Sequence, residues 1–141
     1  MKTQGSATWS GGIRDGKGAI STHSGALDGY PYGFASRFEG KPGSNPEELI
    51  GAAHAACFTM ALSLALTQAG LTADQLSTTA EVTLDKDGDG YAITSSRLTL
   101  EARIPGLDDA RFQAMAEQTM AACPVSKLLK AEISLDAKLI A

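Results

Sequence analysis

The feature that most constrains the fold of this chain is a long helical pattern over residues 46–69. Asn45 is a favoured N-cap residue, and Pro46 suits the first position of a helix. Gly70 provides the C-terminal stop. Between these ends the residues are apolar nearly all round, which is typical of a helix that is buried on every side. The rest of the chain must therefore supply elements that cover this helix.

The same pattern is long and apolar enough to raise the question of a membrane span. It contains polar side chains, is rich in alanine and lacks flanking basic residues, so we expect a buried central helix and no membrane partner. No apolar run near the N-terminus suits a signal peptide, which predicts a cytoplasmic protein. The net charge of −4 and the lack of any Lys/Arg cluster argue against a nucleic-acid partner.

The chain length of 141 residues predicts a single domain over residues 1–141 that can bury a core of its own. The first forty residues have the alternation and turn signals of strands, and the turn sequence Asp87-Gly-Asp-Gly predicts a hairpin. Together these patterns predict an α+β fold. The predicted strands are residues 7–10, 16–22, 30–38, 79–85, 91–102 and 132–139, and the predicted helices are residues 46–69, 108–120 and 124–129.

The chain has two cysteines, Cys57 within the long helix and Cys123 at the start of a short one. Such a pair can hold a metal, form a structural bridge or act as a redox couple. Because stable structural disulfides are rare in a reducing cytosol, the pair points toward chemistry. The alternative is that both cysteines are core residues that behave as small hydrophobic side chains.

Only the thiolate of a cysteine acts as a nucleophile, so the question is what could lower each pKa. Cys57 lies among apolar residues, and burial would raise its pKa, so it needs a nearby cation. Arg37 is the best candidate because it ends an otherwise apolar strand. Cys123 precedes Pro124 at a helix N-terminus, where the helix dipole favours the thiolate. On these grounds either cysteine could be the nucleophile.

Two acids, Glu47 and Glu48, begin the long helix. Glu48 lies about 180° around the helix from Cys57, and we expect it to complete a capping box with Asn45. Glu47 lies about 80° from Cys57, but about 15 Å away along the helix axis. Glu47 would therefore act at the thiol by steering Arg37 or from a second subunit, and the small residues of the helix favour a second subunit. A plain first-turn acid, stabilised by the helix dipole, is the alternative.

A zinc site is the other chemistry that these residues suggest. His54 shares a helix face with Cys57, and His23 and Cys123 could complete a set of four ligands. No tightly spaced ligand pair supports this arrangement, so we expect no metal and a packed His54. The chain also has neither a Gly-x-Ser-x-Gly elbow nor a Gly-rich phosphate loop.

Three stretches of the chain carry a resemblance to a known family. They are Arg37-Phe-Glu-Gly, the helix start Asn45-Pro-Glu-Glu-Leu-Ile-Gly-Ala-Ala-His-Ala-Ala-Cys-Phe, and Ala122-Cys-Pro-Val-Ser. Together they resemble the osmotically inducible protein C family of thiol peroxidases, which is related to the organic hydroperoxide resistance proteins. The similarity runs from Trp9 to the closing strand. His54 in the helix and the Arg37-Phe-Glu-Gly motif resemble the osmotically inducible branch more than the organic hydroperoxide resistance branch.

The resemblance implies an intertwined homodimer in which antiparallel strands wrap around the long central helices, with active sites at the subunit interface. It implies that Cys57 is the peroxidatic thiol and Cys123 the resolving thiol. Arg37 would hold the Cys57 thiolate, and Glu47 would orient Arg37. No cofactor is implied.

The implied reaction reduces organic hydroperoxides, and hydrogen peroxide less efficiently, through a sulfenic acid and then a disulfide. An external dithiol, typically a lipoylated protein, would reduce the disulfide by exchange. The apolar neighbours Phe38, Phe58 and Met60 would favour organic substrates. Two other classes stay open: a redox sensor that oxidises once without efficient recycling, and a binding module whose cysteines are core residues.

Overall fold

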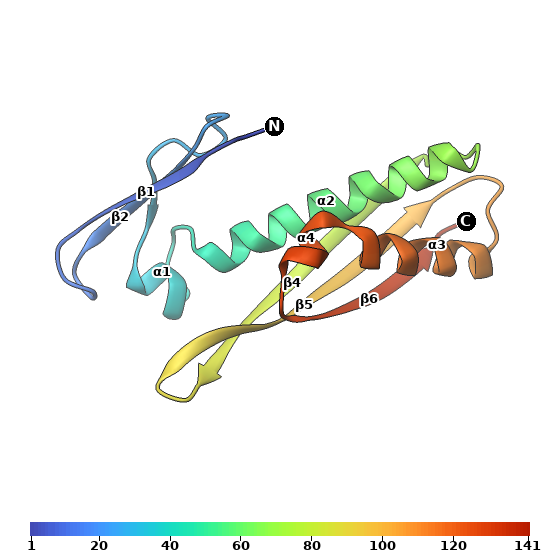
Figure 1. Cartoon of the computed structure of the whole chain (residues 1–141). Coiled ribbons are helices and arrows are strands. Elements are labelled where there is room, and N and C mark those ends of the chain that lie inside the picture. Colours follow the sequence, from blue (N-terminus) through green and yellow to red (C-terminus); the bar gives the residue numbers. More distant parts are fainter. The chain divides into compact units, whose positions relative to one another are not determined.

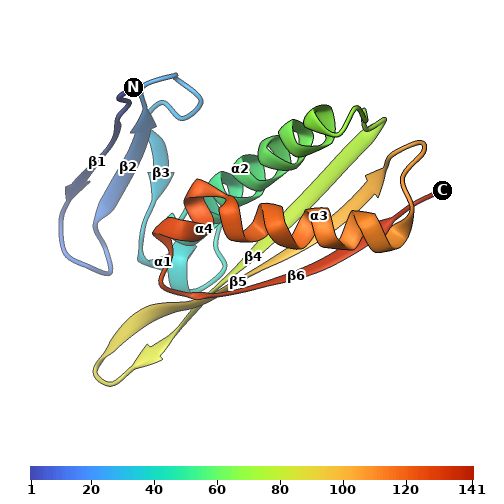
Figure 2. The same ribbon diagram turned by 45° about the vertical axis from the view of Figure 1, so that its right-hand side comes forward.

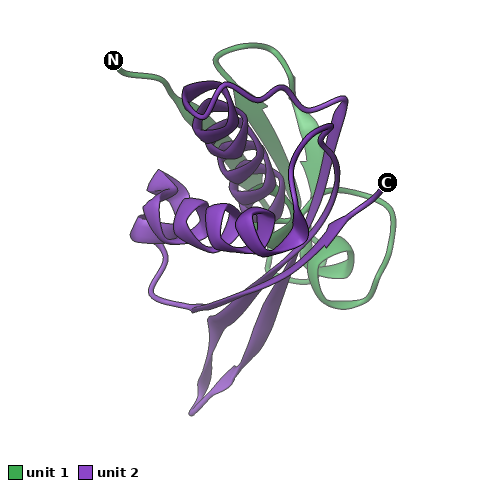
Figure 3. Ribbon diagram, turned by 90° about the vertical axis from the view of Figure 1, so that its right-hand side faces the viewer, with its two compact units in different colours: residues 1–49 green, residues 50–141 purple.

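The computed structural model describes residues 1–141, which divide into two compact units, residues 1–49 and residues 50–141 (Figure 3). Each unit contains a three-stranded sheet. Helices and strands are both major components, so the predicted α+β class is confirmed. The prediction of one domain over residues 1–141 stays a prediction.

Unit 1 is built on a small antiparallel sheet of strands β1 (Gly5–Ser10), β2 (Lys17–Thr22) and β3 (Tyr30–Tyr32). The strands lie in the order β1–β2–β3 (Figure 2). Trp9 of β1 and Tyr32 of β3 meet edge to face across β2, with ring centroids 5.6 Å apart. The sheet therefore carries an aromatic pair on one face.

After β3 the chain forms a short helix, α1 (Phe34–Phe38), so the prediction of a strand over residues 30–38 with Arg37 at its end is wrong beyond Tyr32. Phe34 and Phe38 stack with centroids 5.0 Å apart. Aromatic residues four positions apart satisfy both the period of a strand and the i, i+4 contact of a helix. The pattern in this short segment was therefore ambiguous.

The Ser36 hydroxyl stabilises the helical conformation of this segment. Its hydroxyl accepts a hydrogen bond from the Gly33 N–H at 2.9 Å, which satisfies a donor at the helix start. The same hydroxyl lies 2.8 Å from the carbonyl oxygen of Ser44. These contacts connect α1 to the segment that leads into the next helix.

Helix α2 (Pro46–Gln68) begins at the predicted residue and ends one residue before the predicted end. The side-chain oxygen of Asn45 accepts a hydrogen bond from the Glu48 N–H at 2.8 Å, as the N-cap prediction requires. The capping box is not reciprocal, because the Glu48 carboxylate instead accepts from the Ser44 hydroxyl at 2.7 Å. Gly70 stops the helix with a φ of +73°, a left-handed conformation that glycine adopts without strain.

Only one face of α2 is buried, so the prediction of burial on every side is wrong for the single chain. His54, Phe58 and Leu62 have no exposed surface, whereas Met60 and Leu64 are 76% and 59% exposed. Within residues 50–141 the sheet and the other long helix contact one side of α2. By length and composition α2 could cross a membrane, but its buried row makes it the core helix of unit 2.

Unit 2 places α2 and α3 on one face of a second sheet (Figures 1 and 2). Its strands lie in the order β4–β5–β6. The first two form the predicted antiparallel hairpin, whereas β6 pairs with β5 in the parallel direction. The reason is that two helices carry the chain back before β6 begins. The elements are β4 (Gln75–Asp87), β5 (Gly90–Arg103), α3 (Asp109–Ala122), α4 (Pro124–Leu128) and β6 (Glu132–Leu139).

The core of unit 2 sets the position of α2 over the sheet. Alternate residues of β5, among them Leu98 and Leu100, pack against Phe58 of α2 and Phe112 of α3, and all four are fully buried. A Cβ atom at Gly51 would lie 2.9 Å from the carbonyl oxygen of Ala80 on β4. Glycine is therefore required for the close approach of α2 to β4, which fixes the depth of the helix.

Candidate active site

The two cysteines, far apart in the sequence, meet within unit 2. Cys57 lies in the middle of α2, and Cys123 occupies the N-cap of α4 with Pro124 at the first helical position. Both thiols are free, and the two side chains are hydrogen-bonded to each other. Cys57 is partly exposed, whereas Cys123 has no exposed surface. A reagent from solvent therefore reaches Cys57 first.

The surroundings of Cys57 favour its protonated form. Burial raises the pKa of the Cys57 thiol, a hydrogen bond from the Val125 backbone N–H opposes this effect, and the neighbouring Cys123 raises the pKa further. The net direction is upward, as expected for a helical cysteine in apolar surroundings. The prediction that Cys57 needs a cation is consistent with this result.

The surroundings of Cys123 favour its thiolate. Burial would raise the pKa of Cys123, but hydrogen bonds from the Ser126 N–H, the Cys57 thiol, the Ser126 hydroxyl and the Val125 N–H together lower it. The pKa shifts of the two thiols are opposite in direction, and the Cys57 thiol is the donor side of the hydrogen bond between them. Cys123 is thus the more acidic member of the pair.

Arg37 of α1 and Glu47 of α2 form an ion pair within unit 1. The Arg37 Nη2 donates to Glu47 Oε1 at 2.6 Å, and its Nε lies 3.2 and 3.3 Å from the two carboxylate oxygens. The Glu47 side chain is 12% exposed and the Arg37 side chain 36% exposed. A carboxylate that contacts two nitrogens of one guanidinium restricts its orientation, and the third nitrogen, Nη1, makes none of these contacts.

The structure thus brings together the predicted site residues in two pairs, Cys57 with Cys123 and Arg37 with Glu47. The first pair belongs to unit 2 and the second to unit 1. The predicted action of Arg37 and Glu47 on the Cys57 thiolate therefore stays a prediction.

An open, mostly aromatic cleft of about 330 Å³ surrounds the Arg37 side chain in unit 1. Phe38, whose ring centre lies 5.4 Å from the Arg37 guanidinium carbon, contributes to this cleft. Phe58 and Met60, which we also expected to favour organic substrates, do not line this cleft. Phe58 is buried in the core of unit 2, and Met60 is exposed on α2. The cleft residues are Trp9, Ile13, Tyr32, Gly33, Phe34, Arg37 and Phe38.

The residues weighed as zinc ligands do not form a donor set. The two ring nitrogens of His54 are engaged by hydroxyl groups, Nδ1 by Ser96 at 2.7 Å and Nε2 by Ser126 at 2.8 Å. No group of three His, Cys, Asp or Glu side chains that could hold a metal gathers anywhere in the chain.

The chain is similar to proteins of one known family. The family model described as OsmC-like protein matches residues 38–138. The chain belongs to the OsmC-like protein family. The resemblance inferred from the three sequence motifs is thereby confirmed.

The OsmC-like chain is 55% identical over 136 residues to the peroxiredoxin OsmC of Escherichia coli (strain K12), covering 96% of this chain and 95% of the relative. It is 32% identical over 99 residues to an organic hydroperoxide resistance protein of Xanthomonas axonopodis pv. citri (strain 306), covering 68% and 66%. The crystal structure of the organic hydroperoxide resistance protein OhrB of Bacillus subtilis matches with a TM-score of 0.68 at 28% identity, covering 97% and 98%.

Two serines of the OsmC-like site were missed by sequence reasoning. Ser126 lies three residues after Cys123, at the third position of α4, and this spacing could have suggested a contact with the sulfur. Ser96 lies on β5 and gave no signal, because nothing in its local sequence connects it to His54. The series of contacts from Ser96 through His54 and Ser126 to the thiols therefore forms only when β5, α2 and α4 pack together.

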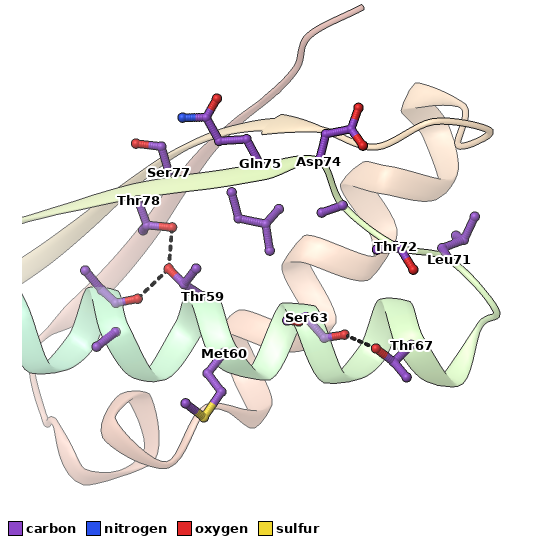
Figure 4. A pocket seen from close by; sticks show the side chains of 14 residues that line it. Thr59, Met60, Ser63, Thr67, Leu71, Thr72, Asp74, Gln75, Ser77 and Thr78 are labelled. Atoms are coloured by element: carbon purple, nitrogen blue, oxygen red, sulfur yellow. Dashed lines mark hydrogen bonds between the residues drawn. The ribbon is translucent and has the colours of Figure 1, made fainter.

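A larger groove of about 770 Å³ lies between α2 and β4 (Figure 4). Thr59 Oγ1 lies 2.7 Å from the Ala55 carbonyl oxygen and 2.7 Å from Thr78 Oγ1 across the base of this groove. Met60 also contributes to the groove lining. Neither cysteine is among the residues that line this groove.

Proposed function

We propose that this OsmC-like protein is a cysteine-based peroxidase that reduces organic hydroperoxides, and hydrogen peroxide less efficiently. The observation that carries the proposal is the direct contact between a partly exposed Cys57 and a fully buried Cys123, both as free thiols. The names of the relatives, a peroxiredoxin and an organic hydroperoxide resistance protein, support the same activity.

Exposure assigns the two thiols to different steps. A hydroperoxide can reach Cys57, so Cys57 is the peroxidatic residue. Its thiolate attacks one peroxide oxygen: an S–O bond forms, the O–O bond breaks, and the departing alkoxide takes a proton and leaves as the alcohol. Cys57 is left as a sulfenic acid beside the shielded Cys123, which is the resolving residue.

Resolution and recycling complete the cycle. The Cys123 thiolate attacks the Cys57 sulfur, the S–S bond forms, and the S–O bond breaks as hydroxide takes a proton and leaves as water. An external dithiol then reduces the disulfide by two exchange steps and is itself oxidised to a disulfide. A lipoylated protein is the reductant that we propose, and the cycle uses no organic cofactor or metal.

We assign Arg37 as the cation that Cys57 needs, because burial and the neighbouring Cys123 raise the pKa of the Cys57 thiol. Glu47 fixes the guanidinium and leaves Nη1 to donate to the thiolate. The aromatic cleft around Arg37 offers an apolar surface for the organic part of the substrate. These roles rest on the chemistry of the two pairs and on the family membership.

We propose that the protein acts as a homodimer with the active sites at the subunit interface. The exposed Met60 and Leu64 give α2 an uncovered apolar face that a second copy would bury. Glu47 holds Arg37 about 15 Å along α2 from Cys57, so the pair most readily serves the Cys57 of the other subunit. The proposed setting is the cytoplasm, where dithiol reductants keep the cycle running.

The test is steady-state consumption of cumene hydroperoxide driven by dihydrolipoamide. Wild type is expected to turn over, Cys57→Ser to be inactive, and Cys123→Ser to consume one equivalent of peroxide and then accumulate sulfenic acid. Turnover by Cys57→Ser at the wild-type rate would overturn the proposal. Wild-type oxidation without recycling by the dithiol would instead favour a redox sensor.

A further inference from the structure

His54 is a buried titratable residue that the proposed cycle does not use. It has no exposed surface, and burial lowers its pKa, so the ring is neutral near pH 7. A neutral imidazole carries one N–H donor and one nitrogen acceptor. Its two partners, Ser96 on β5 and Ser126 on α4, must therefore play opposite roles, one donating to the ring and the other accepting from it.

Ser126 connects this histidine to the thiol pair. Its hydroxyl contacts His54 Nε2 at 2.8 Å and also hydrogen-bonds to the sulfur of Cys123, to which the Ser126 backbone N–H donates as well. Ser126 is buried, and no buried side-chain polar atom of the chain lacks a hydrogen-bond partner. The hydroxyl has a single proton, so its direction depends on which neighbour accepts it.

We propose that Ser126 donates its hydroxyl proton to the Cys123 thiolate and that His54, anchored by Ser96, is the positioning residue that holds Ser126 in this orientation for the resolving step. The hydrogen bonds then run in one direction. The Ser96 hydroxyl donates to His54 Nδ1, His54 Nε2–H donates to the Ser126 oxygen, and the Ser126 hydroxyl donates to the Cys123 sulfur. His54 is therefore the Nε2–H tautomer.

This arrangement rests on the proposed function and explains how a fully buried thiol can resolve a sulfenic acid. In that step the Cys123 thiolate forms the S–S bond, the S–O bond of Cys57 breaks, and the departing hydroxide takes the proton that Cys123 had released to solvent. Burial disfavours the thiolate of Cys123, and the donors on α4 offset this cost. His54 stays neutral throughout and takes no proton from the thiol.

A thiolate titration tests the hydrogen bond without any peroxide. In Cys57→Ser protein Cys123 is the sole thiol, and its ionisation is followed by ultraviolet absorbance against pH. Adding Ser126→Ala should raise the midpoint by about one to two pH units, because a hydrogen bond to a charged group is lost. Cys57 and, through Ser126, His54 are the titratable groups in contact with Cys123. An unchanged midpoint would overturn the proposal.

The matched control is Thr119→Val, which removes a buried hydroxyl that donates only to the Met115 carbonyl oxygen at 2.8 Å. It should leave the midpoint where it is. An equal shift in Thr119→Val and Ser126→Ala would mean that the loss of any buried hydroxyl perturbs the unit, and the proposal would fail. Thermal melts of both variants verify that each remains folded.

Rapid kinetics with both cysteines present test the role in resolution. With one equivalent of cumene hydroperoxide, Ser126→Ala should slow disulfide formation roughly three- to tenfold more than it slows peroxide consumption. The reaction slows because less of Cys123 is ionised, and part of this loss is offset because the thiolate of a less acidic thiol is more nucleophilic. Equal effects on both steps would overturn the inference and leave the peroxidase standing. A wild type that consumes no peroxide would overturn both.

The tautomer of His54 tests the positioning role directly. The chain has two histidines, so nitrogen NMR can assign the ring of His54 with His23→Gln as the reference. We expect the neutral Nε2–H form at a pH where Cys123 is ionised. The Nδ1–H form under those conditions would reverse the direction of the hydrogen bonds that link Ser96, His54 and Ser126, and it would refute the assignment.

Discussion

The substitution Glu47→Gln isolates the charge of the carboxylate that holds Arg37. Glutamine has almost the same shape and keeps one oxygen that can accept from the guanidinium. The three contacts of the present pair, 2.6, 3.2 and 3.3 Å, all depend on two negatively charged oxygens. The variant therefore retains the packing of the first turn of α2 while it loses the charge-assisted part of the interaction.

The magnitude follows from the kind of hydrogen bond that is lost. A hydrogen bond to a charged group contributes about 1.5–3 kcal/mol and a neutral one about 0.5–1.5 kcal/mol, so the change costs about 1–1.5 kcal/mol. A direct Coulomb energy of about 4 kcal/mol at 4 Å is an upper bound, because the Arg37 side chain is 36% exposed and water screens the pair. A free-energy change of about 1.4 kcal/mol corresponds to a tenfold change in an equilibrium constant.

We expect kcat/KM for cumene hydroperoxide to fall roughly tenfold in Glu47→Gln, because the guanidinium occupies its restricted orientation about one tenth as often. Steady-state assays with dihydrolipoamide measure this directly. The control is Glu48→Gln, which changes the neighbouring acid that accepts from the Ser44 hydroxyl and does not contact Arg37. Its kcat/KM should remain at the wild-type value.

Equal kcat/KM values for Glu47→Gln and Glu48→Gln would refute this reasoning. Such a result would mean that the ion pair seen in unit 1 only stabilises the start of α2, as a first-turn acid does. A loss that accompanies unfolding would be recognised by circular dichroism and set aside.

Two further predictions concern assembly and pH. Met60→Glu places a charge on the uncovered face of α2 and should convert the dimer that we expect in sedimentation velocity to a monomer, whereas Leu128→Glu, which changes the 77% exposed leucine of α4, should not; a monomeric wild type would contradict the homodimer. Burial lowers the pKa of His54 below 6.5, so below that pH the unfolded chain binds a proton that the folded chain does not. The free energy of unfolding, measured in urea, should therefore have its full value above pH 6.5 and decline below that pH by at most about 1.36 kcal/mol per pH unit. His54→Gln should lose this decline and His23→Gln should keep it; a decline that persists in His54→Gln would exclude His54 as its cause.

Local chemistry determined where the main elements begin and end. The cap at Asn45, the stop at Gly70 and the turn at Gly88 each act within a few residues, so the bounds of α2 and the turn of the hairpin could be predicted from the sequence, whereas β4 begins four residues before the predicted residue 79. The segment 34–38 was the exception, because its aromatic spacing suits a strand and a helix equally well. There the Ser36 hydroxyl accepts from the Gly33 N–H, a contact at the helix start that the aromatic spacing did not indicate.

The sequence also marked Cys57, Cys123, Arg37 and Glu47 as candidates, through residue type and resemblance. The resemblance implied the pairs Cys57–Cys123 and Arg37–Glu47, but the local sequence around each residue does not show which of them touch. The contact between the two thiols depends on how α4 packs against α2, and the Arg37–Glu47 pair depends on the turn of α1. The burial of α2 on one face alone likewise depends on the tertiary structure, in which α3 and the second sheet cover only that face.

The clearest case is the row of contacts from Ser96 through His54 to Ser126. Each residue lies on a different element, β5, α2 and α4, and no spacing rule relates positions so far apart along the chain. The sequence by itself determined a helix with a thiol and an imidazole one turn apart. Only the tertiary structure decided which hydroxyls meet that imidazole, because their positions are set by the packing of the sheet and α4 against α2.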